Sequence, residues 1–523
     1  MKVNQLKAGS IITYVQIILN IVISIVYTPI MLRILGPSEH GLYSTVSSTI
    51  SWLSILTLGF GGSYIRYYAK YKASGEDEKI SGLNGMFLTI FSVLGTIALV
   101  CGIALSFNLK LVYSEGLTQD EYATAKILAL IITLNLALSF PASVFNGMIR
   151  SQEKFIQVKV MNLLQTVCSP LLTLPILLMG YGSIGMVVVT TVVDLFVYTL
   201  NIFYCFRKLK VKIRFGHWEK GLFRSIAGFS LFIALNSIIG QINTSMDKIL
   251  LGRFVGTASV SVYAIGFSLY VYFTAFSTAI SSMFVPRIHQ IVNSETGENL
   301  RNRLTEVFVR LGRLQFLIQA LMFSGIIFFG RPFILFWAGE GYENAYYIAL
   351  LLCGAAFIPQ CQMIGVEVQR AQNKHKVRTI VYSFMALANV VLTVLLIRKY
   401  GELGAPVGTA IAVVTMDVLF MNWYYHKKLN FNVVSFWSNM IRIVVGLLPA
   451  LGIGVLIMRF APMHSLWLML AFIAVYVIVF GVTAFLLSMN RYERDLITTP
   501  LKKMFKSHKK IRERENLEGH SED

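Results

Sequence analysis

The sequence predicts an all-α integral membrane protein with about fourteen transmembrane helices. Of its 523 residues, 55% are hydrophobic and only 14% are charged, whereas a soluble domain carries about 25% charged residues. The apolar residues form continuous runs of about 20 residues, the length with which a helix crosses a bilayer. Because the runs do not alternate between apolar and polar positions, a membrane β-barrel is disfavoured.

Fourteen apolar runs define the predicted membrane spans. The first run follows Lys2 and Lys7 without a small-residue cleavage site after it, so we interpret it as a membrane helix rather than a removed signal peptide. The loops between the runs are short and leave no room for a soluble catalytic domain. The approximate bounds are 10–32, 41–65, 85–107, 123–148, 158–180, 183–206, 225–246, 259–284, 311–330, 345–366, 379–397, 403–424, 441–458 and 465–488.

The distribution of Lys and Arg predicts how the chain lies in the membrane. Thirty-seven of the 46 basic residues fall in the two tails and the even-numbered loops, and nine fall in the odd-numbered loops. Since cytoplasmic loops carry the excess of positive charge, both termini are expected in the cytoplasm and the number of spans should be even. The net charge of +20 arises in these loops, not in a basic patch on a soluble domain of the kind that binds nucleic acid.

An internal repeat divides the chain. The pair Leu35-Gly36 recurs 216 positions later as Leu251-Gly252. Two further matches follow in the same order, Arg150-Ser-Gln152-Glu-Lys154 with Arg370-Ala-Gln372-Asn-Lys374 and Tyr181-Gly-Ser-Ile-Gly185 with Tyr400-Gly-Glu-Leu-Gly404. The repeated unit has six helices, an even number, so both copies have the same orientation and their interface is expected to hold a substrate site.

The repeat predicts four parts of the chain. They are a first lobe over 1–216 with helices 1–6, a second lobe over 217–432 with helices 7–12, an added pair of helices 13 and 14 over 433–490, and a basic cytoplasmic tail over 491–523. We expect the tail to lie against anionic lipid or to stay disordered.

Two carboxylates fall inside predicted spans, Asp194 in the sixth and Asp417 in the twelfth. A charged group at the centre of a bilayer costs at least ~2.5–3.5 kcal/mol, so such residues suggest function. Asp194 and Asp417 are therefore candidate ion-coupling residues that bind a proton or sodium. The alternative is that each carboxyl group is hydrogen-bonded to a neighbouring helix for structural reasons.

Polar residues form a stripe on the first helix of each half. In the seventh span the stripe comprises Asn236, Gly240, Asn243 and Asp247, and in the first span it comprises Thr13, Gln16, Asn20, Ser24 and Tyr27. At 100° per residue each set shares one helix face. The stripes predict a hydrated cleft in which Asn20, Asn236, Asn243 and Asp247 bind substrate, although hydrogen bonding between helices would produce the same pattern.

Basic residues at the ends of spans suggest an anionic substrate. Arg33, Lys248 and Arg253 lie near the predicted outer face, against the general charge bias, and Arg66 and Arg313 lie near inner ends. A guanidinium group binds two phosphate oxygens at once, so a cavity lined by these residues would suit a diphosphate. For the Arg residues at inner ends the alternative is ordinary snorkelling to the membrane surface.

The sequence contains no recognisable catalytic or cofactor motif. Walker loop, HExxH and GxSxG motifs are absent in their expected contexts. All five Cys residues lie in apolar stretches without a CxxC pair, which argues against disulfides and metal sites. We therefore expect no enzymatic activity, no cofactor and no metal site.

Three segments of the chain resemble a known family. They are Thr28-Pro-Ile-Met-Leu-Arg33-Ile-Leu-Gly36-Pro-Ser-Glu-His-Gly41-Leu-Tyr43, Leu58-Gly-Phe-Gly61-Gly-Ser-Tyr-Ile-Arg66-Tyr-Tyr-Ala-Lys70-Tyr, and Asp247-Lys-Ile-Leu-Leu-Gly252 with the following Val262-Tyr263. These segments resemble the Wzx-type polysaccharide flippases, the polysaccharide transporter family of the multidrug/oligosaccharidyl-lipid/polysaccharide superfamily, which has a MATE-like fold. Arg33, Arg66 and Asp247 match signature positions of that family.

The resemblance implies a function. It implies two six-helix lobes that open alternately to each side of a bacterial cytoplasmic membrane and move a polyprenyl-diphosphate-linked oligosaccharide for capsule, O-antigen or exopolysaccharide synthesis. The lipid tail would stay in the bilayer and enter beside helices 1 and 8, and a polysaccharide polymerase complex is an expected partner.

Two alternatives stay open. A drug or metabolite cation antiporter of the same superfamily would usually have twelve helices. A membrane polymerase or ligase of lipid-linked sugars would carry a large basic outer loop.

Overall fold

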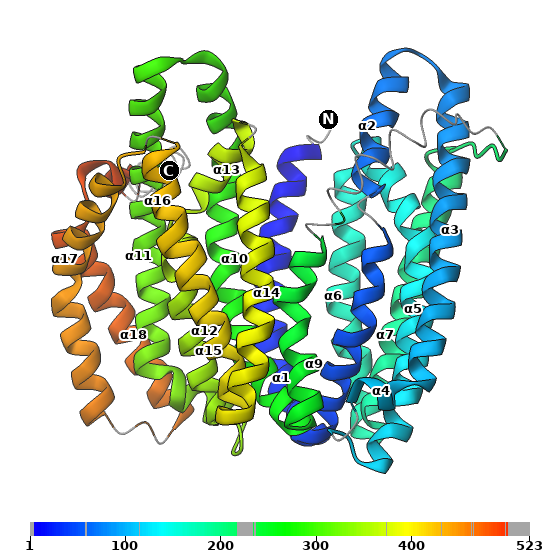
Figure 1. Cartoon of the computed structure of the whole chain (residues 1–523), viewed down its shortest axis with the longest axis horizontal. Coiled ribbons are helices and arrows are strands. Elements are labelled where there is room, and N and C mark those ends of the chain that lie inside the picture. The colour runs from blue at the N-terminus through cyan, green and yellow to red at the C-terminus, as the bar shows by residue number, and fades with distance from the viewer. Residues whose placement is uncertain are drawn as a thin grey trace, which may run out of the picture. The chain divides into compact units, whose positions relative to one another are not determined.

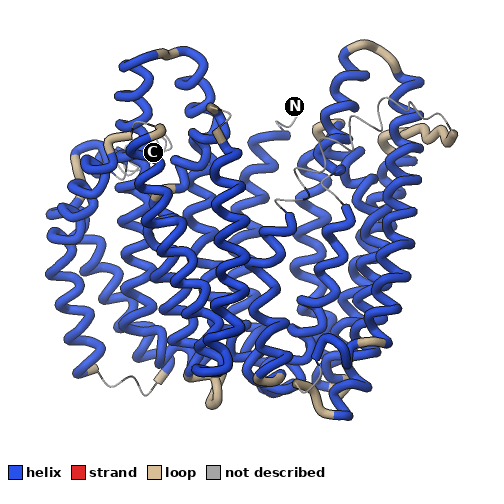
Figure 2. The backbone as a smooth tube through the Cα atoms, viewed as in Figure 1, coloured by secondary structure: helices blue, strands red, loops and turns tan. Residues whose placement is uncertain are grey.

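The computed structural model describes residues 5–57, 60–113, 116–216, 234, 237–372, 374–429, 431–461, 463, 465–496 and 498–499. Within these residues every regular element is a helix and no strand occurs (Figure 2). The all-α prediction is therefore confirmed. Most of the predicted basic tail over 491–523 lies outside the described residues.

The helices follow one another in the order of the apolar runs. Their bounds are α1 (Gln5–Ser51), η1 (Trp52–Thr57), α2 (Phe60–Ala73), α3 (Asp77–Phe107), α4 (Leu109–Tyr113), α5 (Gln119–Ser151), α6 (Phe155–Leu178), α7 (Gly182–Arg207), η2 (Ile242–Met246), α9 (Asp247–Phe254), α10 (Thr257–Ser294), α11 (Gly297–Trp337), α12 (Asn344–Cys361), α13 (Met363–Ala371), α14 (His375–Tyr400), η3 (Gly401–Leu403), α15 (Gly404–Val413), η4 (Val414–Phe420), α16 (Met421–Lys427), α17 (Val433–Phe460), α18 (Leu466–Thr483) and η5 (Ala484–Ser488). Of the η elements, η1 and η3 are 3-10 helices, and η2, η4 and η5 are π-helices.

α1 contains the first predicted span and the start of the second, joined at a kink. At the kink Gly36 has a φ of 71° and a ψ of 172°, a conformation that glycine adopts easily because it has no Cβ. Pro37 follows, and its fixed φ suits the first turn of a new helix. The sequence predicted a loop over 33–40, and the connection is shorter because these two residues make the change of direction.

Eleven helical segments of the described chain are long and apolar enough to cross a membrane. This is therefore a multi-pass membrane protein. Two of the segments, Leu19–Ala73 and Lys376–Lys427, each cover parts of two predicted runs. Half of the run at 225–246 lies outside the described residues, so the count of fourteen stays a prediction.

The chain divides into two compact units, and the first comprises Met1–Ser268, Ile334–Leu352 and Arg378–Ala412. In this unit α3, α5, α6 and α7 form a helical bundle (Figure 1). α3 approaches α5 closely at two glycines. A Cβ atom on Gly95 would lie 2.6 Å from the Ala137 carbonyl oxygen, and one on Gly102 would lie 2.3 Å from Thr133 Cγ2. Small residues of this kind allow membrane helices to pack backbone to backbone.

The second unit comprises Leu269–Phe333, Cys353–Val377 and Val413–Asp523. Aromatic rings form much of its core, and the ring centroid of Phe308 lies 5.0 Å from those of Phe431 and Phe436. α17 and α18, which correspond to the predicted helices 13 and 14, pack against each other in this unit. The predicted lobe boundaries at 216 and 432 stay predictions.

α10 and α11 extend well beyond the predicted spans 259–284 and 311–330. At 1.5 Å per residue the 38 residues of α10 measure about 57 Å, against about 30 Å for the hydrocarbon core of a bilayer. The parts of both helices that belong to the second unit form a hairpin that projects past its neighbours in that unit (Figure 1). The apolar runs mark only the membrane-embedded parts of these helices.

Candidate functional site

Asp247 lies in a buried cluster of oxygen-bearing side chains within the first unit, with only 3% of the residue exposed. Tyr263 Oη donates a hydrogen bond of 2.7 Å to Asp247 Oδ2, and Thr409 Oγ1 donates one of 3.0 Å to the same oxygen. Thr393 Oγ1 lies 3.4 Å from Asp247 Oδ1. The cluster therefore draws side chains from α9, α10, α14 and α15 around one carboxylate.

Asn389 adds a further acceptor to this cluster. Its Oδ1 atom lies 3.2 Å from both Thr393 Oγ1 and Thr409 Oγ1. Each Thr hydroxyl has a single hydrogen, so it cannot donate to Asp247 and to Asn389 at the same time. Five oxygen–oxygen contacts thus share three hydroxyl hydrogens. A proton on Asp247, or a small cation that prefers oxygen ligands, would satisfy a contact that is left without a hydrogen.

The helix that carries Asp247 changes its geometry directly before this residue. The π-helix η2 covers Ile242–Met246, and α9 begins at Asp247. A π-helix has more residues per turn than an α-helix and is frequent at functional sites. The predicted stripe assumed 100° per residue throughout. Asn243 therefore lies, half-buried, in a segment to which that spacing does not apply.

Asp194 occupies a second polar cluster in the first unit. Asn135 Nδ2 donates a hydrogen bond of 2.8 Å to Asp194 Oδ2, and Gln165 Nε2 donates one of 2.5 Å to Oδ1. The carboxylate on α7 is thus held by amide groups from α5 and α6. These are the contacts that the structural alternative predicts, and the ion-coupling role stays a prediction.

Asp417 lies in the second unit within the π-helix η4 and is 9% exposed. It has interactions with its surroundings, and its position inside a π-helix agrees with the frequent occurrence of such turns at functional sites. Its proposed role as an ion-coupling residue stays a prediction.

Arg313 forms a buried ion pair in the second unit. Its Nε donates to Glu493 Oε1 over 2.7 Å and its Nη2 donates to Glu493 Oε2 over 2.9 Å, with 7% and 1% of the two side chains exposed. Nη2 also donates to the Ser488 carbonyl oxygen over 2.8 Å. The guanidinium group that we predicted to bind substrate therefore joins α11 to the segment after α18 in this structure.

The other predicted substrate-binding residues do not converge on the Asp247 cluster through any described contact. Asn20 and Arg66 are exposed, and Arg33 is exposed with its Nη2 3.5 Å from the Phe336 carbonyl oxygen. Lys248 is half-buried with its Nζ 5.4 Å from the Phe267 ring centroid, and Arg253 is exposed beside the Phe254 ring. Asn236 lies outside the described residues.

Of the residues in the Asp247 cluster, Tyr263 was named in the sequence analysis as part of a family-like segment, and the three residues contributed by the eleventh and twelfth spans were missed. Asn389 and Thr393 lie four residues apart in the eleventh span, so they share a helix face, and Thr409 lies in the twelfth. Each is a common residue in membrane helices, where it usually bonds a neighbouring helix. The sequence feature that could have indicated these partners is the four-residue spacing of Asn389 and Thr393 in an otherwise apolar helix.

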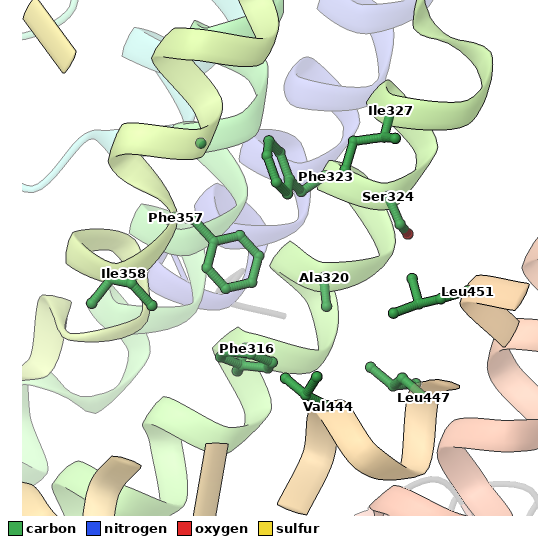
Figure 3. A pocket seen from close by; sticks show the side chains of 11 residues that line it. Phe316, Ala320, Phe323, Ser324, Ile327, Phe357, Ile358, Val444, Leu447 and Leu451 are labelled. Carbon is green, nitrogen blue, oxygen red and sulfur yellow. The ribbon is translucent and has the colours of Figure 1, made fainter. Parts of the chain in front are cut away.

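An apolar pocket of about 360 Å³ lies in the second unit. The rings of Phe316, Phe323 and Phe357 line it together with Leu447 and Leu451 (Figure 3). Ser324 contributes the one hydroxyl group of its lining, and the walls come from α11, α12 and α17. Such a lining suits hydrocarbon rather than a sugar or a diphosphate.

Comparison with known proteins identifies the family. The family described as polysaccharide biosynthesis protein matches residues 6–292, which is more than half of the chain. The chain belongs to this family. Its signature segments around Gly36, Arg66 and Asp247 lie within the matched region.

Two curated relatives match most of this family member. The putative O-antigen transporter of Shigella flexneri is 21% identical over 404 residues, which cover 76% of this chain and 91% of the relative. The probable flippase AglR of Haloferax volcanii is 22% identical over 394 residues, which cover 74% of this chain and 76% of the relative.

Solved structures share the fold. A lipid II flippase MurJ in an inward closed conformation superimposes with a TM-score of 0.72 at 16% identity, and the match covers 94% of this chain and 99% of MurJ. An inward-facing MATE family transporter of the MOP superfamily gives a TM-score of 0.62 at 13% identity and covers 78% of this chain and 96% of that protein. The predicted MATE-like membrane fold is confirmed.

Proposed function

We propose that this protein is a flippase that moves a polyprenyl-diphosphate-linked oligosaccharide across the bacterial cytoplasmic membrane by alternating access. The observation that carries the proposal is the match of residues 6–292 to the polysaccharide biosynthesis family. Two relatives named a transporter and a flippase support it. The product would feed the synthesis of a surface polysaccharide, with a polysaccharide polymerase as the expected partner.

The physical need for such a protein follows from the substrate. A charged diphosphate with an attached chain of sugar hydroxyls is strongly disfavoured in hydrocarbon, because its polar groups lose their hydrogen bonds to water. A protein lowers this barrier by offering a polar path for the headgroup while the polyprenyl chain stays in the lipid. We propose that Arg33, Arg66, Lys248 and Arg253 attract the diphosphate, since guanidinium and ammonium groups bind phosphate oxygens.

Net transport in one direction needs an energy source. We propose that Asp247 takes up a proton or a small monovalent cation during the cycle, since the five oxygen–oxygen contacts of its cluster share only three hydroxyl hydrogens. Asp194 and Asp417 are proposed as further coupling residues. The orientation that we propose has both termini in the cytoplasm, as the excess of basic residues in the tails and even-numbered loops indicates.

Transport in vesicles tests the function. Lipid-linked oligosaccharide extracted from the host cells and labelled on its sugar would be placed in the inner leaflet of vesicles with and without the purified protein. We expect the label to become accessible to an impermeant reagent outside only when the protein is present. Absence of this movement, together with efflux of cationic dyes from the same vesicles, would favour an antiporter instead.

A further inference from the structure

In the first unit, turns from the first six helices meet the starts of later helices at the predicted outer face. The meeting residues are Ser38, His40 and Gly41 of the turn in α1, Gly116 and Glu121 before and in α5, and Gly252, Thr257 and Ser261 of α9 and α10. We propose that these contacts form an outer gate, closed in this structure, with Glu121 as its latch. The proposal rests on the proposed function for its membrane orientation.

Glu121 bridges the two halves of the repeat with its two carboxylate oxygens. Oε2 accepts hydrogen bonds from the Thr118 backbone nitrogen over 2.8 Å and from Thr118 Oγ1 over 3.0 Å, which fixes it to the start of its own helix. Oε1 accepts from Ser38 Oγ and from Thr257 Oγ1, both over 2.6 Å. The carboxylate thus connects the cap of α5 to the first residue of α10, and hydrogen bonds to a charged acceptor are stronger than neutral ones.

Two glycines bring the backbones of the two halves into direct contact. A Cβ atom on Gly41 would lie 1.7 Å from the Thr257 carbonyl oxygen, and one on Gly116 would lie 1.8 Å from the Gly252 carbonyl oxygen. No side chain fits at either position without separating the two backbones. The fit at both points therefore depends on glycine, and a larger residue would force the gate apart.

A second chain of hydrogen bonds runs deeper in the same interface. His40 Nδ1 lies 2.7 Å from Ser261 Oγ, and Ser261 Oγ lies 3.0 Å from Tyr342 Oη. His40 and Ser261 are both buried. Burial raises the pKa of Tyr342 above its ordinary value, so its hydroxyl keeps its hydrogen for the chain. These contacts add a link between α1, α10 and the turn before α12.

The chemistry of the interface suits a contact that opens and closes. Its links are hydrogen bonds between small polar side chains and backbone contacts at glycine, and water can replace each of them when the surfaces separate. Beside these links, Ile249 of α9 packs against the apolar core that contains Leu42 and Tyr113. Opening of the gate therefore also separates this apolar contact, while water replaces the hydrogen bonds and the glycine contacts.

A reversible crosslink tests the gate. Ser38 Oγ and Thr257 Oγ1 lie 3.1 Å apart, so cysteines at these positions in the S38C/T257C variant should form a disulfide on oxidation. We expect oxidation to lower transport of the labelled lipid-linked oligosaccharide by about tenfold, as expected when one of two states is locked, and dithiothreitol to restore it. In the single variants S38C and T257C, which cannot form this crosslink, the transport rate after oxidation should equal the rate of the same variant under reducing conditions. Failure to crosslink, or full transport by the crosslinked protein, would overturn the proposal.

A second measurement needs no substrate. The S261C variant places a thiol in the deeper, buried part of the closed gate, and an impermeant maleimide added outside should label it slowly. Adding Gly41→Ala should raise the labelling rate by about tenfold through a shift toward the open state, whereas Gly481→Ala, which has open space around it, should leave the rate unchanged. Equal rates with and without Gly41→Ala would contradict the gate. A protein that crosslinks and labels as expected but moves no glycolipid would contradict only the proposed function.

Discussion

The ion pair between Arg313 and Glu493 is buried, so its loss should lower the free energy of unfolding. Changing Arg313 to Ala leaves the Glu493 carboxylate uncompensated, and breaking a buried pair from one side costs about 3–5 kcal/mol. The loss of stability in Arg313→Lys should be intermediate, because an ammonium group cannot donate parallel hydrogen bonds to both carboxylate oxygens of Glu493 as a guanidinium group does. Thermal unfolding in detergent measures the effect. The control is Arg303→Ala, whose partner Glu306 is half-exposed, where a loss below about 1 kcal/mol is expected. Equal losses in the two variants would contradict the anchoring role.

Asp247 should control how transport responds to an ion gradient. Asn in its place keeps the shape of the side chain but cannot ionise, so the cluster loses its ability to bind and release a positive centre. We expect transport by D247N with an imposed proton or sodium gradient to fall to the rate that the unmodified protein shows after an ionophore collapses the gradient. Glycolipid appearance outside vesicles measures both rates. Asp77→Asn, on an exposed side chain, is the control, and a D247N protein that still responds to the gradient would refute the coupling role.

Arg33 and Arg66 test the anionic headgroup. Both side chains are exposed, so their removal should not unfold the protein. If they attract a diphosphate, Arg33→Ala and Arg66→Ala should each lower transport by about 10–150-fold, since hydrogen bonds to a charged group contribute about 1.5–3 kcal/mol. Membrane abundance, measured on the same vesicles, should be unchanged. Arg459→Ala at the end of α17 is a matched basic control. Normal transport by both variants would exclude them from the headgroup path.

The sequence identified single residues whose type is unusual in a membrane helix, but it did not show which residues distant in the chain lie next to them. Asp247 stood out because it continues the polar stripe of the seventh span and matches a signature position of the family. Its partners Thr393 and Thr409 lie more than 140 positions later. Threonine is common in membrane helices because its burial costs little free energy, so no local sequence pattern connects these two residues to Asp247. Arg313 illustrates the opposite case. Its charge was evident, but only the fold shows that its guanidinium group faces Glu493.

At the scale of single helices, an α-helical spacing of residues predicts which residues share a helix face, except where a helix changes from α-helical to π-helical geometry. Apolar length located α5, α6 and α7 to within a few residues and the end of α3, whose start lies at Asp77 instead of residue 85. It does so because burial in lipid requires every backbone group to be bonded within a helix. The π-helices η2 and η4 were not predictable. Neither contains a glycine or proline that would mark it. The polar stripe predicted through Asn243 to Asp247 runs through η2, where the α-helical spacing of 100° per residue does not hold.

The glycines of α3 offer a test of helix packing. At Gly95 a Cβ atom would meet the Ala137 backbone oxygen at 2.6 Å, and a backbone atom cannot move aside alone. Gly95→Ala should therefore lower the stability of the bundle by about 1–3 kcal/mol, the range for overpacked cores. Gly452→Ala in α17 has nothing within 4 Å and should be neutral or stabilising by up to about 1 kcal/mol, since alanine favours helix. Thermal unfolding of the two variants in the same detergent checks the difference, and a stable Gly95→Ala protein would contradict the close contact of α3 and α5.

At the scale of the whole molecule, composition was sufficient to predict the fold class, because only a few kinds of structure can span a bilayer. A chain with continuous apolar runs has to cross as helices, and MurJ and MATE structures share the resulting arrangement. The division of the chain was harder to predict. The first compact unit includes segments such as Ile334–Leu352 and Arg378–Ala412 from far along the sequence, since spatial packing need not follow the order of a repeat.

Orientation is a property of the entire chain and can be tested as such. If the 37 basic residues of the tails and even-numbered loops face the cytoplasm, a cysteine placed in any even-numbered loop should react with an impermeant maleimide only after the membrane is opened. Lys79→Cys and Arg301→Cys, at exposed positions near the starts of α3 and α11 and within predicted even-numbered loops, should be protected in intact cells. Glu402→Cys, in a predicted odd-numbered loop, should be labelled directly. The unmodified protein supplies the background from its own five cysteines. Labelling of Lys79→Cys from outside, or protection of Glu402→Cys, would reverse the orientation and place the proposed gate on the cytoplasmic side.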